Sequence, residues 1–203
     1  MRKIIVLCFI SLDGVMQAPG GPEEDQSGGF SYGGWVVRYF DEFLAREMAI
    51  QMSRPFDLLL GRKTYDIFAS YWPNANPDDL GAAALNGATK YVVSKTLVNP
   101  SWKNTIVING DAVREIEKIR KMNGPDLQVH GSSNLIQTLL KNDMVDEFWL
   151  KIFPVTLGSG KRLFGEGTLP AAFTLQKCES SPNGVIVASY IRDGAIKTGS
   201  FIQ

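Results

Sequence analysis

The stretch that decides the fold is residues 57–71, which read DLLLGRKTYDIFASY. Residues 57–60 contain three leucines in a run of the length of a short buried strand, and Gly61 ends that run. Residues 64–71 then have the pattern of a short helix, which stops before a Trp-Pro pair. Repeated strand-turn-helix units of this kind build a parallel sheet with helices packed on it. The segment therefore predicts an α/β protein.

The same alternation continues on both sides of this segment. Apolar and β-branched runs predict strands at residues 3–10, 57–60, 91–94, 105–108, 127–130, 145–155, 173–179 and 184–192. Apolar side chains at helical spacing predict helices at residues 36–52, between residues 108 and 127, and from Ser132 or Ser133 through Leu140. Repeated units that end in an antiparallel hairpin predict one α/β domain, residues 1–203, with a central mixed, mostly parallel sheet.

The composition excludes several classes of function. The chain has 21 Lys+Arg and 21 Asp+Glu, so its net charge is zero, and it lacks the charge of proteins that bind nucleic acid or anionic membranes. The longest apolar run, residues 4–10, is too short to span a membrane, and the residues after it argue against a signal peptide. One histidine and two distant cysteines, Cys8 and Cys178, form no metal-binding motif. We expect buried, reduced thiols, no metal and a cytoplasmic location.

Residues 18–35 form a long, glycine-rich connection between the first strand and the first helix. The segment contains six glycines and almost no apolar side chain before Phe30. Loops of this length in compact domains are usually functional lids or disordered segments. Because the segment leaves the sheet at the carboxyl end of a strand, where α/β proteins bind ligands, we expect a mobile flap over an active site rather than a passive surface insertion.

Three turns combine features that bind phosphate groups. Residues 61–65 read Gly-Arg-Lys-Thr-Tyr between a strand and a helix, so free backbone N–H groups, a hydroxyl and two cations converge there. Residues 94–96 add a hydroxyl and a cation at the end of the next strand, and residues 131–133 form another turn whose glycine lets a ligand approach the backbone. Each motif alone is weak evidence, because cations near helix starts are often only solvated.

The order of the motifs makes them more specific. They are Ser-Leu-Asp-Gly at 11–14, Gly-Arg-Lys-Thr-Tyr at 61–65, Val-Val-Ser-Lys-Thr-Leu at 92–97, Val-His-Gly-Ser at 129–132, Val-Asp-Glu-Phe at 145–148 and Pro-Val-Thr-Leu-Gly-Ser-Gly-Lys-Arg-Leu-Phe at 154–164. With them, residues 4–191 resemble the dihydrofolate-reductase-like superfamily, most closely the C-terminal reductase domain of bifunctional riboflavin-biosynthesis deaminase-reductases and its stand-alone relatives. The resemblance implies a three-layer fold and an NADPH-dependent reductase, with cofactor and substrate meeting at the carboxyl edge of the sheet.

The resemblance also implies which residues bind the cofactor. Residues 61–64 would receive its phosphates, and residues 131–133 would pass under the pyrophosphate. Ser94 and Lys95 would meet the 2′-phosphate of the adenosine ribose, which favours NADP over NAD. Ile10, Ser11 and Val15 would lie beside the nicotinamide. The other residues that the resemblance assigns to cofactor binding are Gly61, Arg62, Lys63, Thr64, Ser94, Lys95, Thr96, Gly131, Ser132, Ser133 and Leu135.

Reduction of a C=O or C=N bond needs a proton donor as well as a hydride. Folate reductases have a carboxylate on the first helix for this purpose, but the matching residues here, 43–45, are Phe, Leu and Ala. Dihydrofolate is therefore not expected as the main substrate. Asp13, in the turn after the first strand, is the first candidate for a polar group near the reacting centre, and an ordinary turn aspartate is the alternative.

Asp41 is the second catalytic candidate, because it is the one residue of the first helix that a small shift in register could bring into the role of proton donor. The repeat of apolar residues every four positions assigns Phe40 and Leu44 to the buried face of this helix, and Asp41 stands one position beyond that face. Glu42 and Glu47 are expected to point further round the helix, toward solvent.

The substrate-binding candidates are Phe30, Trp35 and His130. The aromatic residues favour an apolar, planar substrate, whereas the histidine is either a pocket residue or a buried strand residue. A ribosylaminopyrimidine phosphate, the substrate in riboflavin synthesis, would need further cations, for which the candidates are Arg38, Lys151, Lys161 and Arg162.

Three functions stay open on the sequence alone. They are a reductase of an unassigned heterocyclic, carbonyl or imine compound, the pyrimidine reductase of riboflavin synthesis, and a non-catalytic NADP-binding module. The expected partners are a small-molecule substrate and a second copy of the chain in a homodimer, with no nucleic acid and no membrane.

Overall fold

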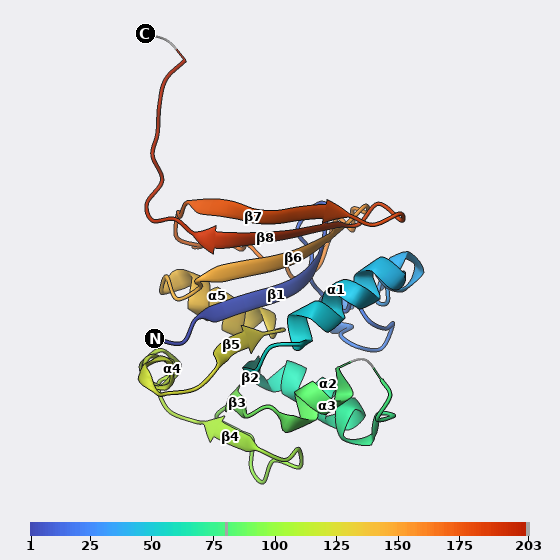
Figure 1. Cartoon of the computed structure of the whole chain (residues 1–203), viewed down its shortest axis with the longest axis vertical. Coiled ribbons are helices and arrows are strands. Elements are labelled where there is room, and N and C mark those ends of the chain that lie inside the picture. The colour runs from blue at the N-terminus through green and yellow to red at the C-terminus, as the bar shows by residue number, and fades with distance from the viewer. Residues whose placement is uncertain (80, 202–203) are drawn as a thin grey trace.

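The computed structural model describes residues 1–79 and 81–201. Its centre is one eight-stranded sheet in the order β4-β3-β2-β5-β1-β6-β8-β7 (Figure 1). The strands are β1 (Ile4–Ser11), β2 (Phe56–Gly61), β3 (Lys90–Val93), β4 (Thr105–Ile108), β5 (Asp126–Val129), β6 (Glu147–Phe153), β7 (Phe173–Ser180) and β8 (Ile186–Arg192). Neighbours from β4 to β6 are parallel, whereas β8 is antiparallel to β6 and β7. The predicted α/β fold with an antiparallel C-terminal hairpin is confirmed.

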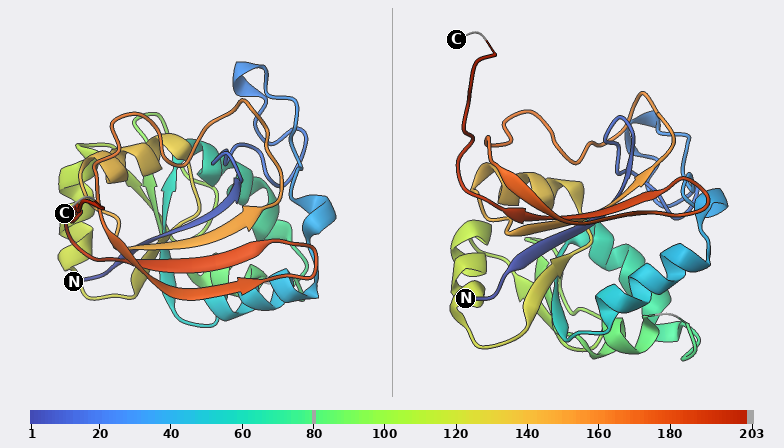
Figure 2. Two further views of the ribbon diagram at one scale, coloured as in Figure 1. Left: turned by 90° about the horizontal axis from the view of Figure 1, so that it is seen from above. Right: turned by 45° about the horizontal axis from the view of Figure 1, so that its top comes forward.

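Helices cover both faces of the sheet. They are α1 (Glu42–Met52), α2 (Arg62–Tyr71), α3 (Ala82–Gly87), α4 (Ala112–Lys121) and α5 (Ser133–Lys141). On one face, α4 and α5 bury Ile116 and Ile136 against β1 and β5, and on the other α2 and α3 bury Tyr65 and Leu85 against β2 and β3. Figure 2 shows α5 and α1 on opposite sides of the sheet. This three-layer arrangement follows because the central strands are apolar on both faces. None of the described helices is long and apolar enough to cross a membrane.

The first helix begins later than the sequence pattern predicts. Asp41 is its N-cap and accepts a hydrogen bond from the backbone N–H of Leu44 at 2.9 Å, so the helix starts at Glu42. The preceding Val37–Tyr39 form a separate 3₁₀ turn. Leu44 is buried as expected, but Phe40 is 44% exposed, and its prediction as part of the buried face is wrong.

Two further expectations about burial are corrected by contacts with the C-terminal hairpin. Glu47, expected to face solvent, is buried, because its carboxylate lies 2.7 Å from Lys177 Nζ of β7. Cys178, expected to be buried, is exposed, because β7 is the edge strand of the sheet. Cys8 of the central strand β1 is buried as predicted.

Residues 18–35, which we call the flap, emerge from the carboxyl end of β1 and lie beside the loop after β6 (Figure 2). Two hydrogen bonds tie the residues just before the flap to that loop, from Met16 N to Lys161 O at 2.8 Å and from Lys161 N to Gln17 Oε1 at 2.9 Å. At the other end of the molecule, residues 193–201 extend away from the sheet (Figure 1).

Candidate active site

A cavity of about 780 Å³ opens beside the carboxyl ends of the central strands. Its walls come from β1, α1, α2, the turn between β5 and α5, β6, residues 16–25 and Lys161. The position matches the usual ligand site of α/β proteins, and the volume lies within the range of small-molecule and cofactor sites. Most of the apolar wall is formed by Phe9, Met48, Met52, Ile67, Phe68 and Trp72.

One end of the cavity is formed by the N-terminus of α2 and the turn between β5 and α5. The backbone N–H of Thr64 donates to Ser132 Oγ at 3.2 Å, and the two hydroxyl oxygens lie 3.1 Å apart. A Cβ atom on Gly131 would lie 2.5 Å from Thr64 Oγ1, and a Cβ atom on Gly61 would lie 2.5 Å from Ser132 Oγ. Glycine at both positions therefore lets the two turns interlock. The peptide bond between Gly131 and Ser132 is cis.

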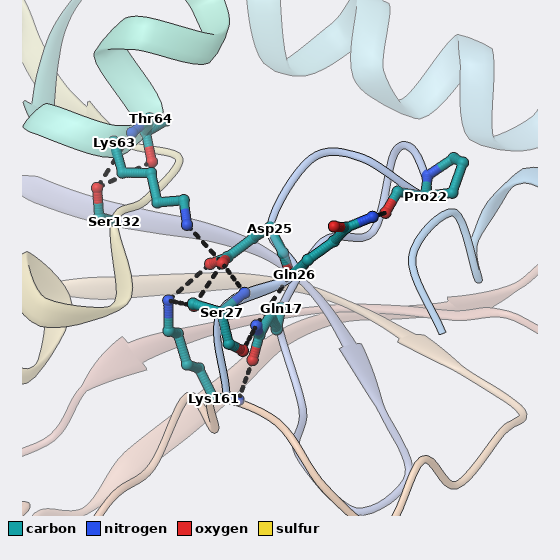
Figure 3. A network of polar contacts seen from close by, with 9 residues as sticks. All are labelled: Gln17, Pro22, Asp25, Gln26, Ser27, Lys63, Thr64, Ser132 and Lys161. Atoms are coloured by element: carbon teal, nitrogen blue, oxygen red, sulfur yellow. Dashed lines mark hydrogen bonds and ion pairs between the residues drawn. The ribbon is translucent and has the colours of Figure 1, made fainter. Parts of the chain in front are cut away.

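The flap adds a carboxylate to this end of the cavity. Asp25 Oδ1 lies 2.5 Å from Lys63 Nζ, and Asp25 Oδ2 lies 2.6 Å from Lys161 Nζ (Figure 3). Lys161 also donates to Ser27 Oγ at 2.8 Å. Burial opposes ionisation of this carboxyl group, but the hydrogen bonds from Lys161 and Lys63 hold the pKa of Asp25 well below its usual range. The two lysines thus hold an anion at the N-terminus of α2.

A second cavity, of about 840 Å³, lies beyond the ends of β3 and β4 and is lined by Ser94 and Lys95. Ser94 Oγ accepts hydrogen bonds from the backbone N–H groups of Thr96 at 3.2 Å and of the next residue at 3.0 Å. Arg62 of α2 reaches the same turn, since its Nη1 lies 3.3 Å from Thr96 Oγ1. Lys95 is therefore the described cation of this cavity wall, which also contains Asp111, and Arg62 lies next to the turn that follows Lys95.

The far wall of the first cavity carries buried polar groups. Lys151 is 2% exposed, and its Nζ donates to Gln51 Oε1 at 2.5 Å. Gln128 Nε2 donates to the backbone carbonyl of Gln51 at 3.1 Å, and His130 Nε2 lies 3.1 Å from Gln128 Oε1. Burial lowers the pKa of Lys151 to about 8, and burial together with the nearby Lys151 charge lowers the pKa of His130 to about 4.

The chain matches one protein family along nearly its whole length. The model of the RibD C-terminal domain matches residues 2–187. The chain belongs to the RibD C-terminal domain family. Family membership makes it a reductase-like domain and confirms the resemblance seen in the sequence motifs.

Two curated proteins of one bacterium match about four fifths of the chain. The chain is 32% identical over 170 residues to the uncharacterized protein YyaP of Bacillus subtilis (strain 168), and the aligned residues cover 80% of each chain. It is 26% identical over 169 residues to YwjB of the same organism, covering 82% of this chain and 85% of YwjB.

Two solved structures share the fold of this RibD C-terminal family member. A putative riboflavin biosynthesis protein from Shewanella sp. PV-4 superposes with a TM-score of 0.70 at 23% identity, over 95% of this chain and 99% of that one. A pyrimidine reductase-like protein from Corynebacterium diphtheriae gives a TM-score of 0.62 at 15% identity, over 95% and 92% of the two chains.

The cofactor residues expected for this family fall into three places. Lys63, Thr64, Gly131, Ser132 and Ser133 line the first cavity, and Ser94 and Lys95 line the second. Three others lie next to these lining residues: Gly61 packs against Ser132, and Arg62 contacts Thr96 in the turn after Lys95. Ile10, Ser11, Val15 and Leu135 are buried in the core and are absent from the described walls of both cavities.

Asp13 is held within the turn after β1 and is not among the described residues that line the cavity. Its carboxylate accepts hydrogen bonds from Ser11 Oγ at 2.6 Å and from the backbone N–H groups of Leu157 and Gly158 at 3.1 and 2.8 Å. The Ser11 hydroxyl and then these amides outweigh burial and lower the pKa of Asp13 to about 2. These contacts support the alternative of a turn aspartate, because a group so readily ionised is a poor proton donor at neutral pH.

Asp41, Phe30 and Trp35 also stand outside the described cavity wall. Asp41 caps α1, as its hydrogen bond to Leu44 shows. Phe30 and Trp35 are buried in a cluster with Phe153, and Trp35 Nε1 donates to the backbone carbonyl of Gln17 at 2.8 Å. Their positions support anchoring of the flap rather than direct contact with a substrate.

Sequence reasoning missed two cavity residues and considered a third only as an anion site. Asp25 and Gln51 gave no local signal, because each acquires its role through a partner distant in sequence. Lys151 did give a signal, since it stands within the apolar run of residues 148–153, and a lysine in a central strand is rarely buried without a reason. His130 does line the cavity, which agrees with one of its two predicted roles. Among the described residues, no cluster of His, Cys, Asp and Glu side chains could hold a metal ion.

Proposed function

We propose that the protein is a reductase that binds NADPH across the two cavities and transfers a hydride to a small, planar carbonyl, imine or heterocyclic compound. The observation that carries the proposal is the anion site at the start of α2. There, Lys63 and Lys161 hold the Asp25 carboxylate next to the interlocked turns of Thr64 and Ser132. A carboxylate in this position indicates that the site accepts a phosphate oxygen of similar charge and size.

The residues present fit the dinucleotide along its length. Lys63, Thr64 and Ser132 offer an ammonium group and two hydroxyls to the pyrophosphate. Lys95 lines the second cavity and Arg62 contacts the adjacent Thr96, and these two cations would meet the 2′-phosphate, which NADH lacks. Bound NADPH supplies the hydride. The flap would cover it and exclude water.

The wall of the first cavity argues against dihydrofolate as substrate. From α1, the described lining residues are Met48, Gln51 and Met52, none of which is a carboxylate that could protonate a pterin ring. The pyrimidine reductase reaction is the second candidate, supported by family membership. It would need a cation for the substrate phosphate besides those used by the cofactor, and the one described cation of the wall away from the flap is Lys151.

Comparison of NADPH and NADH binding tests the proposal. We expect fluorescence titration to show tighter binding of NADPH by about 2–4 kcal/mol, because two cations contact the 2′-phosphate. Lys95→Ala should remove most of this preference, while Lys103→Ala, which changes an exposed lysine outside both cavity walls, should preserve it. Equal affinities of the wild type for the two dinucleotides would contradict the assignment, and no binding of either would contradict the proposed function.

A further inference from the structure

Lys151 stands at the polar end of an otherwise apolar part of the cavity. Its ammonium group contacts the Gln51 amide, and the ring of Phe9 lies 5.6 Å from its Nζ. Lys151 pairs in register with Phe9 across β6 and β1, so both side chains emerge on the face of the sheet that α1 covers. An ammonium ion has three N–H donors, and Gln51 Oε1 uses one of them. The remaining donors are available to a ligand in the cavity.

The titratable groups around Lys151 come from each element packed against it. Lys151 interacts electrostatically with Cys8 of β1, with Glu47 of α1 and with His130, which follows β5. Glu47 is engaged by Lys177 of β7 at 2.7 Å. Burial raises the pKa of the Cys8 thiol to about 12.

These neighbours leave one practical proton source at this end of the cavity. With its pKa raised to about 12, Cys8 holds its proton too tightly, and with its pKa lowered to about 4, His130 is already neutral at pH 7. Burial lowers the pKa of Lys151 to about 8, against the attraction of Cys8 and Glu47, so at pH 7 this lysine is protonated and readily releases the proton. A donor whose pKa lies near the working pH is the most efficient general acid.

We propose that Lys151, held by Gln51, binds the heteroatom of the substrate's C=O or C=N group and donates the proton that accompanies hydride transfer. The inference deepens the proposed function and rests on it. It also defines the substrate class as neutral, planar molecules, because Phe9 lies beside Lys151 and Phe68 and Met48 line the same cavity.

The step balances for a ketone. The carbonyl carbon gains a C–H bond and two electrons from the reduced dinucleotide, which is oxidised, while the C=O π bond breaks and its electron pair moves to oxygen. The Lys151 N–H bond breaks as the O–H bond of the alcohol forms. Lys151 is left as a neutral amine, and Gln51 continues to hold it. After the alcohol leaves, the amine regains a proton from water.

Three naphthalene derivatives of similar shape test the contact directly. They are 2-acetylnaphthalene, which carries the ketone, 2-ethylnaphthalene, which lacks it, and 2-naphthoate, which carries an anion. NMR of protein labelled with ¹³C at lysine Cε reports on Lys151, and Lys151→Met assigns its resonance. We expect that resonance to titrate near pH 8 and, in the NADPH-bound protein, to shift with the ketone but not with the hydrocarbon.

Kinetics supply the second measurement. For Lys151→Met we expect turnover of the ketone to fall by roughly 10²- to 10⁴-fold, with NADPH affinity within about twofold of the wild type. Lys151→Gln, which keeps a polar group for Gln51, should lose turnover to the same extent as Lys151→Met. Circular dichroism checks that both variants fold. Lys90→Met is the matched control. Lys90 is fully buried outside the cavity wall, and burial lowers its pKa to about 8, as for Lys151.

The pH profile separates proton donation from a structural role. Wild-type kcat should fall above pH 8, whereas Lys151→Arg, which stays charged, should lack this fall over the same range. An unshifted Lys151 resonance with NADPH and the ketone bound, or unchanged turnover in Lys151→Met, overturns the inference. Tighter binding of 2-naphthoate than of the ketone, lost in Lys151→Met, also overturns it, because Lys151 would then be an anion anchor. If the wild type shows no turnover, the NMR shift alone tests whether Lys151 contacts the ketone. Absence of NADPH binding contradicts the proposed function itself.

Discussion

The two ends of the first cavity contain the same kind of residue in opposite surroundings. At the flap end, the side chains of Lys63 and Lys161 are 46% and 37% exposed, and both contact the Asp25 carboxylate. At the far end, Lys151 is 2% exposed and contacts an amide instead of a carboxylate. Water and a counter-ion favour the charged form of a lysine, whereas burial without a carboxylate in contact disfavours it. The difference suggests a division of work, in which the flap end binds phosphate and the far end gives up a proton.

The largest expected effect that tests this division is the loss of a flap-end cation. Lys63→Ala should weaken NADPH binding by roughly 10- to 100-fold, because a charge-assisted hydrogen bond to a phosphate contributes on the order of 1.5–3 kcal/mol. Isothermal calorimetry measures the affinity. The matched control is Lys118→Ala, which removes an exposed lysine of α4 paired with Glu115. If Lys151→Met weakens NADPH binding as much as Lys63→Ala does, the proposed difference in role between the two ends of the cavity is wrong.

A smaller effect, of opposite sign, is expected for Asp25→Asn. This change keeps the shape of the side chain but removes the anion that competes with the cofactor for Lys63 and Lys161. NADPH affinity should rise by roughly 3- to 10-fold, since two charge-assisted contacts no longer have to be exchanged. Hydrogen exchange of the flap amides in the free protein should become faster, because the flap loses its tie to α2. Weaker NADPH binding in this variant would instead mean that Asp25 stabilises the closed flap over the cofactor.

The third expected effect is on stability at alkaline pH. Lys151 has a pKa of about 8 in the folded protein, against 10.5 as the ordinary value, so between these values the unfolded chain binds more protons. The contribution of Lys151 to the free energy of unfolding should therefore rise with pH from about 8 to 10.5. Lys151→Met should reduce this rise, and Lys90→Met should reduce it to a similar extent. Urea unfolding at several pH values measures the slope, and an unchanged slope in Lys151→Met would mean that Lys151 is not desolvated as described.

The sequence predicted those parts of the site that depend on neighbours along the chain. Gly61 and Thr64 stand where a strand turns into a helix, and that local pattern is enough to place Thr64 at the cavity, although its backbone N–H is bonded to Ser132 rather than free. Ser132 follows from the same rule at the next such turn. The end of β3 likewise marks Ser94 and Lys95, which line the second cavity.

The parts that failed depend on partners far away in sequence. The environment of Lys151 arises because β6 pairs with β1 and α1 crosses above them, so Gln51 is its neighbour from 100 residues away. Glu47 is buried because a lysine of β7, 130 residues later, neutralises it. Asp41 caps the first helix, whose start was predicted too early from the spacing of its apolar residues. Spacing alone does not show where backbone hydrogen bonding starts.

The interlocked glycines have a consequence for how the family can change. Because Gly61 and Gly131 admit no side chain without moving Ser132 or Thr64, a saturation library at these two positions should return glycine almost alone. Met48 and Met52 carry no such restriction, since a flexible thioether can be exchanged for other apolar shapes. Selection for new substrates can therefore act on α1 while the joint between α2 and α5 stays constant. One half of the cavity is free to diversify, and the other half would preserve the proposed cofactor site.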